Sequence, residues 1–147
     1  PHTPTATMKT FNFLNHIIAK MEAKASGFNE GIMINTDGLV TEGTVSNIFI
    51  VMENRIVTPV RDAGLLPGVT RQVILELAEE KQIKSEEGTI TPQQLAAADE
   101  AFLTNSLVEI MPFVELDKQP IGTGTPGPVT QELIVSYKKR VQEELQL

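Results

Sequence analysis

The sequence of 147 residues contains no cysteine and no tryptophan, and it has only two histidines. Without cysteine the chain cannot form disulfides, thiolate metal sites or a cysteine nucleophile. His2 and His16 are too few to make a convincing metal cluster. Basic residues number 12 against 19 acidic ones, and the net charge of −7 argues against a nucleic-acid partner, whose phosphates attract basic surfaces.

Long apolar runs are also missing. No segment approaches the length of a membrane span and no signal peptide is visible, so we expect a cytoplasmic protein without a membrane partner. The opening PHTPTATM is typical of an extended lead-in, because each proline disfavours helix in the residue before it. We therefore expect residues 1–8 to connect this chain to sequence that precedes it.

The first half of the chain changes from a helical to an extended pattern. Apolar residues at helical spacing predict a helix over residues 12–26, with Gly27 as its stop. Alternating and β-branched residues then predict strands over 31–35, 39–42, 46–52 and 55–58. Glu53 and Asn54 separate the last two strands and form the expected hairpin turn.

The second half returns to helical spacing. A helix is expected from Gly68 or Val69 to about Lys81, and a short helix from Thr91, its N-cap, with Pro92 at the first helical position. The remaining expected elements are a short strand and turn over 83–90, a buried strand over 100–106, a hairpin over 110–122 and a final helix over 129–147. Together these elements predict an α+β fold with a mixed or barrel-like sheet and surrounding helices.

Three polar stretches interrupt this core pattern and are candidates for chemistry. Lys9 stands directly before the first helix, where desolvation or a nearby cation would make its amine a nucleophile, although a solvated surface charge is the commoner alternative. Glu42 follows a strand in TEGTVSN and could hold a protonated ring nitrogen, or be an exposed turn residue. LLPGVTR (65–71) opens a helix, so its free N–H groups could bind an anion with help from Thr70 and Arg71, or simply begin the helix.

Together these stretches supply what pyridoxal 5′-phosphate needs, which is an amine, a carboxylate and a helix N-terminus. The segments KTFNFLN, TEGTVSNIFIV, LLPGVTRQVI and ADEAFLTNSLVEIMPFV resemble, in order and spacing, those of the class IV aminotransferase family. These are pyridoxal-phosphate enzymes of fold type IV. The resemblance runs over nearly the whole chain and implies its larger, C-terminal cofactor-binding domain over residues 9–147, with the N-terminal domain absent.

The resemblance assigns roles to particular residues. Lys9 looks like the Schiff-base lysine and acid–base group, and Glu42 looks like the partner of the pyridine nitrogen. Leu66 would pack on the cofactor ring. The expected phosphate-side residues are Val69, Thr70, Asn105 and Ser106. Asn47 would shape the strand after Glu42.

Within the family, the resemblance favours the lyase reaction. TVSNIF and FLTNSL look most like aminodeoxychorismate lyases, which release pyruvate and form 4-aminobenzoate for folate synthesis. The alternative is a branched-chain or D-amino-acid aminotransferase, and a second alternative is an inactive fragment or a non-catalytic binding domain. In either enzyme the substrate would be amino-acid-like, and the intact protein would be a homodimer.

Overall fold

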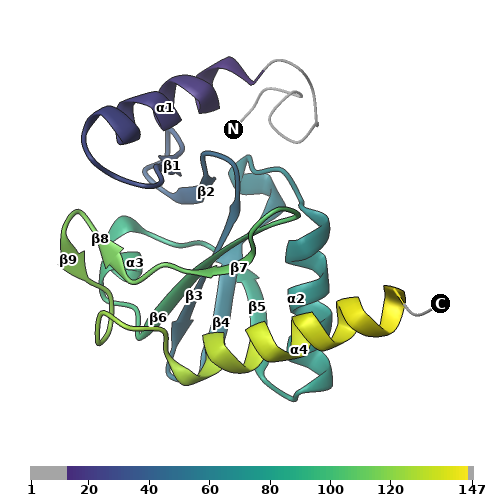
Figure 1. Ribbon diagram of the computed structural model, residues 1–147. Coiled ribbons are helices and arrows are strands. Elements are labelled where there is room, and N and C mark those ends of the chain that lie inside the picture. The colour runs from purple at the N-terminus through teal and green to yellow at the C-terminus, as the bar shows by residue number, and fades with distance from the viewer. Residues whose placement is uncertain (1–12, 146–147) are drawn as a thin grey trace.

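The computed structural model describes residues 13–145, which form an α+β fold of one mixed five-stranded sheet and four α-helices (Figure 1). The helices are Leu14–Ala25 (α1), Val69–Glu80 (α2), Pro92–Ala96 (α3) and Pro128–Leu145 (α4), and a 3-10 turn covers Arg61–Ala63. The strands are Ile32–Ile34 (β1), Val40–Gly43 (β2), Asn47–Met52 (β3), Arg55–Pro59 (β4), Lys84–Gly88 (β5), Glu100–Asn105 (β6), Glu109–Pro112 (β7), Glu115–Leu116 (β8) and Gln119–Pro120 (β9). No helix in this part of the chain has both the length and the apolar character needed to cross a membrane.

The main sheet has the order β5-β4-β3-β6-β7, with β3 at its centre. Only β4 and β5 pair in parallel, and α2 makes the crossover between them. The β1-β2 and β8-β9 pairs form two small separate sheets. The mixed sheet is therefore as expected, whereas the described strands pair as an open sheet and not as a closed barrel, because β5 and β7 remain at opposite edges.

Both faces of the central strand β3 are buried. Phe49 and Val51 pack with Ile74, Leu77 and other residues of α2 and α4, and the rings of Phe49 and Phe102 stack at 4.9 Å. Ile48 and Ile50 point to the other face, which α3, β2 and the segment around β8 and β9 cover. Figure 1 shows α2 and α4 crossing one side of the sheet. The near-continuous apolar run NIFIV in β3 is what burial on two faces requires.

Two local predictions are confirmed in detail. Glu53 and Asn54 both have φ in the left-handed region, 52° and 59°, as a two-residue hairpin loop between β3 and β4 requires. Thr91 caps α3, because its side chain accepts a hydrogen bond from Gln94 N at 3.1 Å while the Gln94 side chain accepts one from Thr91 N.

The first helix differs from expectation in what it buries. The predicted helix forms, but its apolar stripe of Leu14, Ile17, Ile18 and Met21 is exposed. The helix instead faces the rest of the fold with Lys20, whose Nζ lies 3.0 Å from the buried carboxylate of Glu30, and with the small residues Ala19 and Ala23 beside Gly31. Periodicity identifies the helix, but it does not identify the face that contacts this part of the chain.

The long helix α4 begins on a carboxylate of the central sheet. Glu100 in β6 is buried, and its two carboxylate oxygens accept hydrogen bonds from Val129 N at 3.1 Å and Thr130 N at 2.8 Å. These are first-turn amides without a partner inside the helix, and a negative charge suits the helix N-terminus. Gly127 precedes the helix because a Cβ at that position would overlap the Glu100 side chain.

We expect Glu100→Ala to lower the free energy of unfolding by about 2 kcal/mol, because two buried N–H groups lose a charged acceptor. Chemical denaturation of the two proteins measures the change. Glu132→Ala is the matched control on the same helix, since its exposed pair with Lys81 is worth little. Equal losses in the two variants would show that Glu100 does not anchor α4.

Candidate active site

A cleft of about 640 Å³ lies where β2 and β6 end and where β3 and α2 begin. Six residues predicted for the site line it, and Asn47 lines it as well. Lys9, the seventh predicted site residue, lies outside the described residues. The six predicted residues in the lining are Glu42, Leu66, Val69, Thr70, Asn105 and Ser106.

Glu42 is the ionisable side chain among the described residues that line this cleft. It lies near the end of strand β2 with 7% of its surface exposed, although most buried positions of the fold are apolar. One carboxylate oxygen, Oε2, accepts a hydrogen bond from Leu66 N at 3.1 Å, and Oε1 lies 3.1 Å from His16 Nε2. The carboxylate is therefore held from two sides.

Burial raises the pKa of Glu42 above the ordinary value for a glutamate. The Leu66 N–H and the His16 side chain act in the opposite direction, because both stabilise the ionised form, but burial outweighs them. A carboxylate kept in a cleft at this cost is typical of a functional group and not of the exposed turn residue that the local sequence also allowed.

Asn47 fixes the turn that carries the anion-binding candidates. Its Nδ2 donates to Leu66 O at 2.7 Å, and its Oδ1 accepts from Gly68 N at 3.2 Å. Because Asn47 is the first residue of central strand β3, this two-point clamp ties the turn to a strand that is buried along nearly its whole length. A Cβ on Gly68 would overlap Asn47 Oδ1, so glycine is needed here for close approach.

Helix α2 opens into the cleft without a side-chain cap. Gly68 is its N-cap residue and supplies no side chain, and the first turn contains no acidic residue. Among residues 13–145, neither an N-cap side chain nor a first-turn carboxylate therefore serves as acceptor for its first amides. Thr70 is buried in the cleft lining, whereas Val69 stands at the mouth with 76% of its surface exposed.

Arg71 does not contribute its charge to the cleft, contrary to the sequence-based hypothesis. It is 1% exposed, and its Nη2 donates to Pro59 O at 2.9 Å and lies 2.8 Å from Glu87 Oε2. A residue one position after Thr70 points about 100° further round the helix, so the two side chains leave in different directions. Any anion at this helix start would be held by amides and a hydroxyl.

The side chain of Asn105 is also committed elsewhere. Its Nδ2 donates to Val45 O at 3.0 Å, and its Oδ1 accepts from Leu107 N and Val108 N, both at 2.8 Å. Asn105 therefore organises the loop after β6. A contribution from this residue to a bound ligand would have to come from its main chain.

Sequence reasoning missed several groups that the fold brings to the cleft. Phe13 lines it, although the sequence placed this residue only in a helical stripe. Ser46 and Thr104 also line it, and their hydroxyls are buried with no hydrogen-bond partner among residues 13–145. The polar run after Glu42 was the available signal for Ser46, and the polar strand end LTNS (103–106), a possible source of hydroxyl donors, was the signal for Thr104.

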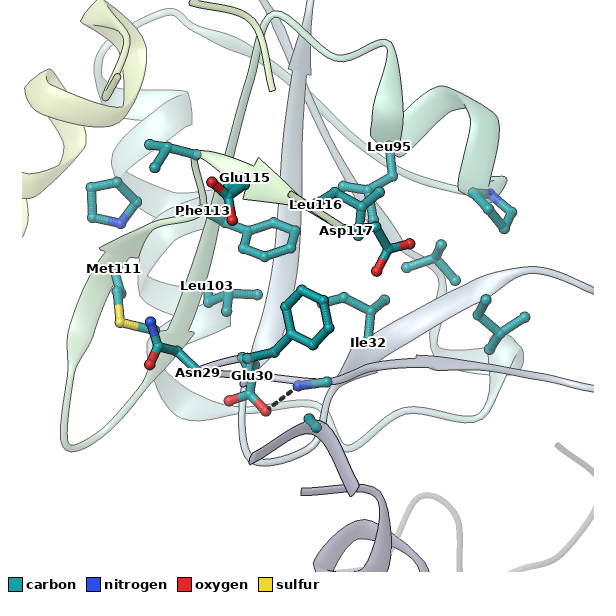
Figure 2. A pocket seen from close by; sticks show the side chains of 18 of the residues that line it. Asn29, Glu30, Ile32, Leu95, Leu103, Met111, Phe113, Glu115, Leu116 and Asp117 are labelled. Atoms are coloured by element: carbon teal, nitrogen blue, oxygen red, sulfur yellow. Dashed lines mark hydrogen bonds between the residues drawn. The ribbon is translucent and has the colours of Figure 1, made fainter. Parts of the chain in front are cut away.

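A second cavity of about 470 Å³ lies beside β1, α3 and the segment around β8. Figure 2 shows apolar side chains such as Ile32, Leu103 and Phe113 gathered around it. The buried carboxylate of Glu30 at its edge is already bonded to Gly31 N and to Thr44 and paired with Lys20. The lining of this cavity is mainly apolar.

Comparison with known proteins identifies the family. Residues 1–116 match amino-transferase class IV, and the chain belongs to this family. It is 36% identical over 137 residues to a D-alanine aminotransferase of Bacillus licheniformis, a match that covers 93% of this chain and 48% of that protein. The chain thus spans about half the length of the curated relatives it matches.

Solved structures share the fold. A T.th. branched-chain amino acid aminotransferase with pyridoxamine 5′-phosphate superposes with a TM-score of 0.87 at 32% identity, covering 93% of this chain and 47% of that one. A Legionella pneumophila protein, provisionally described as a 4-amino-4-deoxychorismate lyase, superposes with a TM-score of 0.89 at 31% identity, covering 94% and 51%.

The clamp at Gly68 can be tested with a double-mutant cycle. We expect Gly68→Ala to lower the free energy of unfolding by about 1–3 kcal/mol, because the new methyl group displaces Asn47 Oδ1 and breaks both hydrogen bonds. In an Asn47→Ala background the same change should cost less than about 1 kcal/mol, since φ of Gly68 is −71° and suits alanine. Additive losses in chemical denaturation would contradict the clamp.

The raised pKa of Glu42 predicts a pH-dependent stability difference for Glu42→Gln. The Glu42 carboxyl binds its proton more tightly in the folded protein than in the unfolded one. The folded wild-type protein therefore loses stability as the pH rises from the ordinary pKa of a glutamate through the raised pKa of Glu42. Glutamine cannot ionise but keeps an acceptor for Leu66 N. In the cofactor-free protein, the free energy of unfolding of Glu42→Gln relative to that of the wild type should therefore increase across this pH range. Above this range the variant should remain the more stable protein. Unfolding free energies measured at a series of pH values test this, and a difference independent of pH would refute it.

Proposed function

We propose that the protein is a pyridoxal-phosphate-dependent aminotransferase acting on amino acids, and that this chain supplies the cofactor-binding part of its site. The observation that carries the proposal is the cleft with Glu42 on one side and the uncapped start of α2 on another. Its residues fit the two polar ends of the cofactor, the ring nitrogen and the phosphate.

The ring end of the cofactor needs an acceptor for a protonated pyridine nitrogen. Glu42 is a buried carboxylate with an oxygen that can accept a further hydrogen bond, and it is fixed by Leu66 N. Leu66 also lines the cleft and offers an apolar contact for the ring. A charge-assisted hydrogen bond at this place would give a buried carboxylate the partner that compensates its desolvation.

The phosphate end needs several hydrogen-bond donors. The amides of Val69 and Thr70 open α2, and the Thr70 hydroxyl lies in the lining. The hydroxyls of Ser46 and Thr104, without partners among the described residues, are further donors in the same lining. Ser106 follows β6 at the cleft and completes the set.

When bound, pyridoxal phosphate would withdraw electrons from the carbon that carries the substrate amine. The chain's own contribution would be to keep Glu42 ionised against the ring nitrogen and to hold the phosphate at α2. Lys9 would hold the cofactor through its aldehyde, and its amine, which is free when the substrate amine has displaced it, would take and return a proton at the substrate Cα. Homodimerisation and a cytoplasmic location stay predictions for the whole protein.

The comparisons favour aminotransfer over the lyase reaction that the sequence motifs first suggested. Curated relatives include D-alanine and branched-chain aminotransferases, so we place the substrate among these amino acids. Release of pyruvate from aminodeoxychorismate is retained as a second candidate, because the Legionella structure superposes equally well. Both reactions begin with removal of the Cα proton, so both use the same residues.

The intact gene product should transfer the amino group of leucine or D-alanine to 2-oxoglutarate, as measured by glutamate formation. With aminodeoxychorismate and no keto acid it should release no pyruvate. Lys9→Ala should abolish transfer, and borohydride should attach the cofactor to the wild-type protein at Lys9 only. Pyruvate release would favour the lyase, and absence of both activities together with absence of trapped cofactor would favour the non-catalytic binding domain.

A further inference from the structure

We propose that His16 is a positioning residue that holds the Glu42 carboxylate from outside the cleft, so that a free lone pair of this carboxylate is directed at the cofactor's ring nitrogen. The inference rests on the proposed function, because it assigns a second residue to the ring-nitrogen contact. His16 belongs to α1, whereas Glu42 belongs to β2, so the contact joins two separate elements.

The geometry places His16 behind Glu42 and not in the space for a ligand. His16 Nε2 lies 3.1 Å from Glu42 Oε1, but His16 is not part of the cleft lining. Its ring stacks on Phe13 with centroids 4.4 Å apart and an angle of 14° between the planes, and Phe13 does line the cleft. His16 can therefore hold Glu42 and support Phe13 while the cleft is occupied.

The hydrogen-bonding chemistry allows the two contacts to exist together. An ionised carboxylate only accepts hydrogen bonds, so Nε2 carries the proton in this contact when Glu42 is ionised. Each carboxylate oxygen has two lone pairs, and Oε1 can accept from His16 and from a ring nitrogen at once. With Leu66 N on Oε2, both oxygens are fixed before a ligand arrives.

His16 is the one described side chain whose charge acts on Glu42. Lys20, on the same helix as His16, pairs with Glu30 at 3.0 Å. His16 opposes the effect of burial and lowers the pKa of Glu42, both through its hydrogen bond and through its charge. Removal of His16 should thus make Glu42 harder to ionise, which a purely structural tether between α1 and β2 would not explain.

Two substitutions separate these roles. His16→Phe removes the donor but keeps a ring against Phe13, and His16→Gln removes the ring but keeps a donor near the position of Nε2. Asn15→Ala, an exposed neighbour on α1, is the matched control. Carboxyl ¹³C NMR of the cofactor-free intact protein, with the Glu42 signal assigned by Glu42→Gln, measures the first readout.

In this experiment we expect the pKa of Glu42 to rise in His16→Phe and to return toward the wild-type value in His16→Gln. Asn15→Ala should leave it unchanged. A pKa of Glu42 that is the same in His16→Phe as in the wild type would overturn the proposal, whatever the protein catalyses.

The second readout uses two probes that differ at one atom, pyridoxamine 5′-phosphate and its analogue with carbon in place of the ring nitrogen. The His16→Phe variant should bind pyridoxamine 5′-phosphate roughly tenfold more weakly than the wild type, since the hydrogen bond from His16 to the charged Glu42 carboxylate is lost. It should bind the carbon analogue as tightly as the wild type does. Equal weakening for both probes would overturn the positioning role and leave the proposed function intact, whereas a wild-type protein that binds neither probe would overturn both.

Discussion

The two-point clamp of Asn47 on the turn from Leu66 to Gly68 is the interaction on which the site depends. It joins the central strand of the sheet to the start of α2, and it bonds the carbonyl of Leu66, the residue whose N–H in turn holds Glu42. The two polar ends of the cleft, carboxylate and helix start, are thus set by one side chain. Because β3 is buried on both faces, this side chain has little freedom to move.

Much of the fold could be predicted from the sequence because local chemistry and tertiary packing agree in it. The helix starts at Gly68 and Thr91, the turn at Glu53 and the run NIFIV each admit few conformations. The arrangement of strands was less predictable, because nothing local says that β5 pairs in parallel with β4 while β6 pairs with β3. The exposed stripe of α1 could not be predicted either, since hydrophobic periodicity records that a face is apolar and not what covers it.

The candidate site was predictable as a set of segments but not as a set of contacts. TEGTVSN and LLPGVTR marked the cleft, and the structure brings Glu42 and Thr70 into it. The contact between His16 and Glu42 joins residues 26 positions apart, and neither histidine count nor spacing indicates it. Conversely, Asn105 and Arg71 lie in or beside the motifs that mark the cleft, but their side chains do not bind there. Asn105 is hydrogen-bonded to the carbonyl of Val45, and Arg71 to the carbonyl of Pro59. Motifs locate a site, whereas side-chain direction decides which members of a motif face it.

The inward position of Arg71 has a consequence for interpreting genetic variation. A substitution there would remove a buried side chain and leave the Pro59 carbonyl and the exposed Glu87 carboxylate without their partner, so we expect the protein to be lost by misfolding and turnover. In a genetic screen that scores only growth, such an allele would be indistinguishable from a lesion at neighbouring Thr70. Cellular protein level would separate the two, because an allele at Thr70 that spares the fold would leave an abundant but inactive protein.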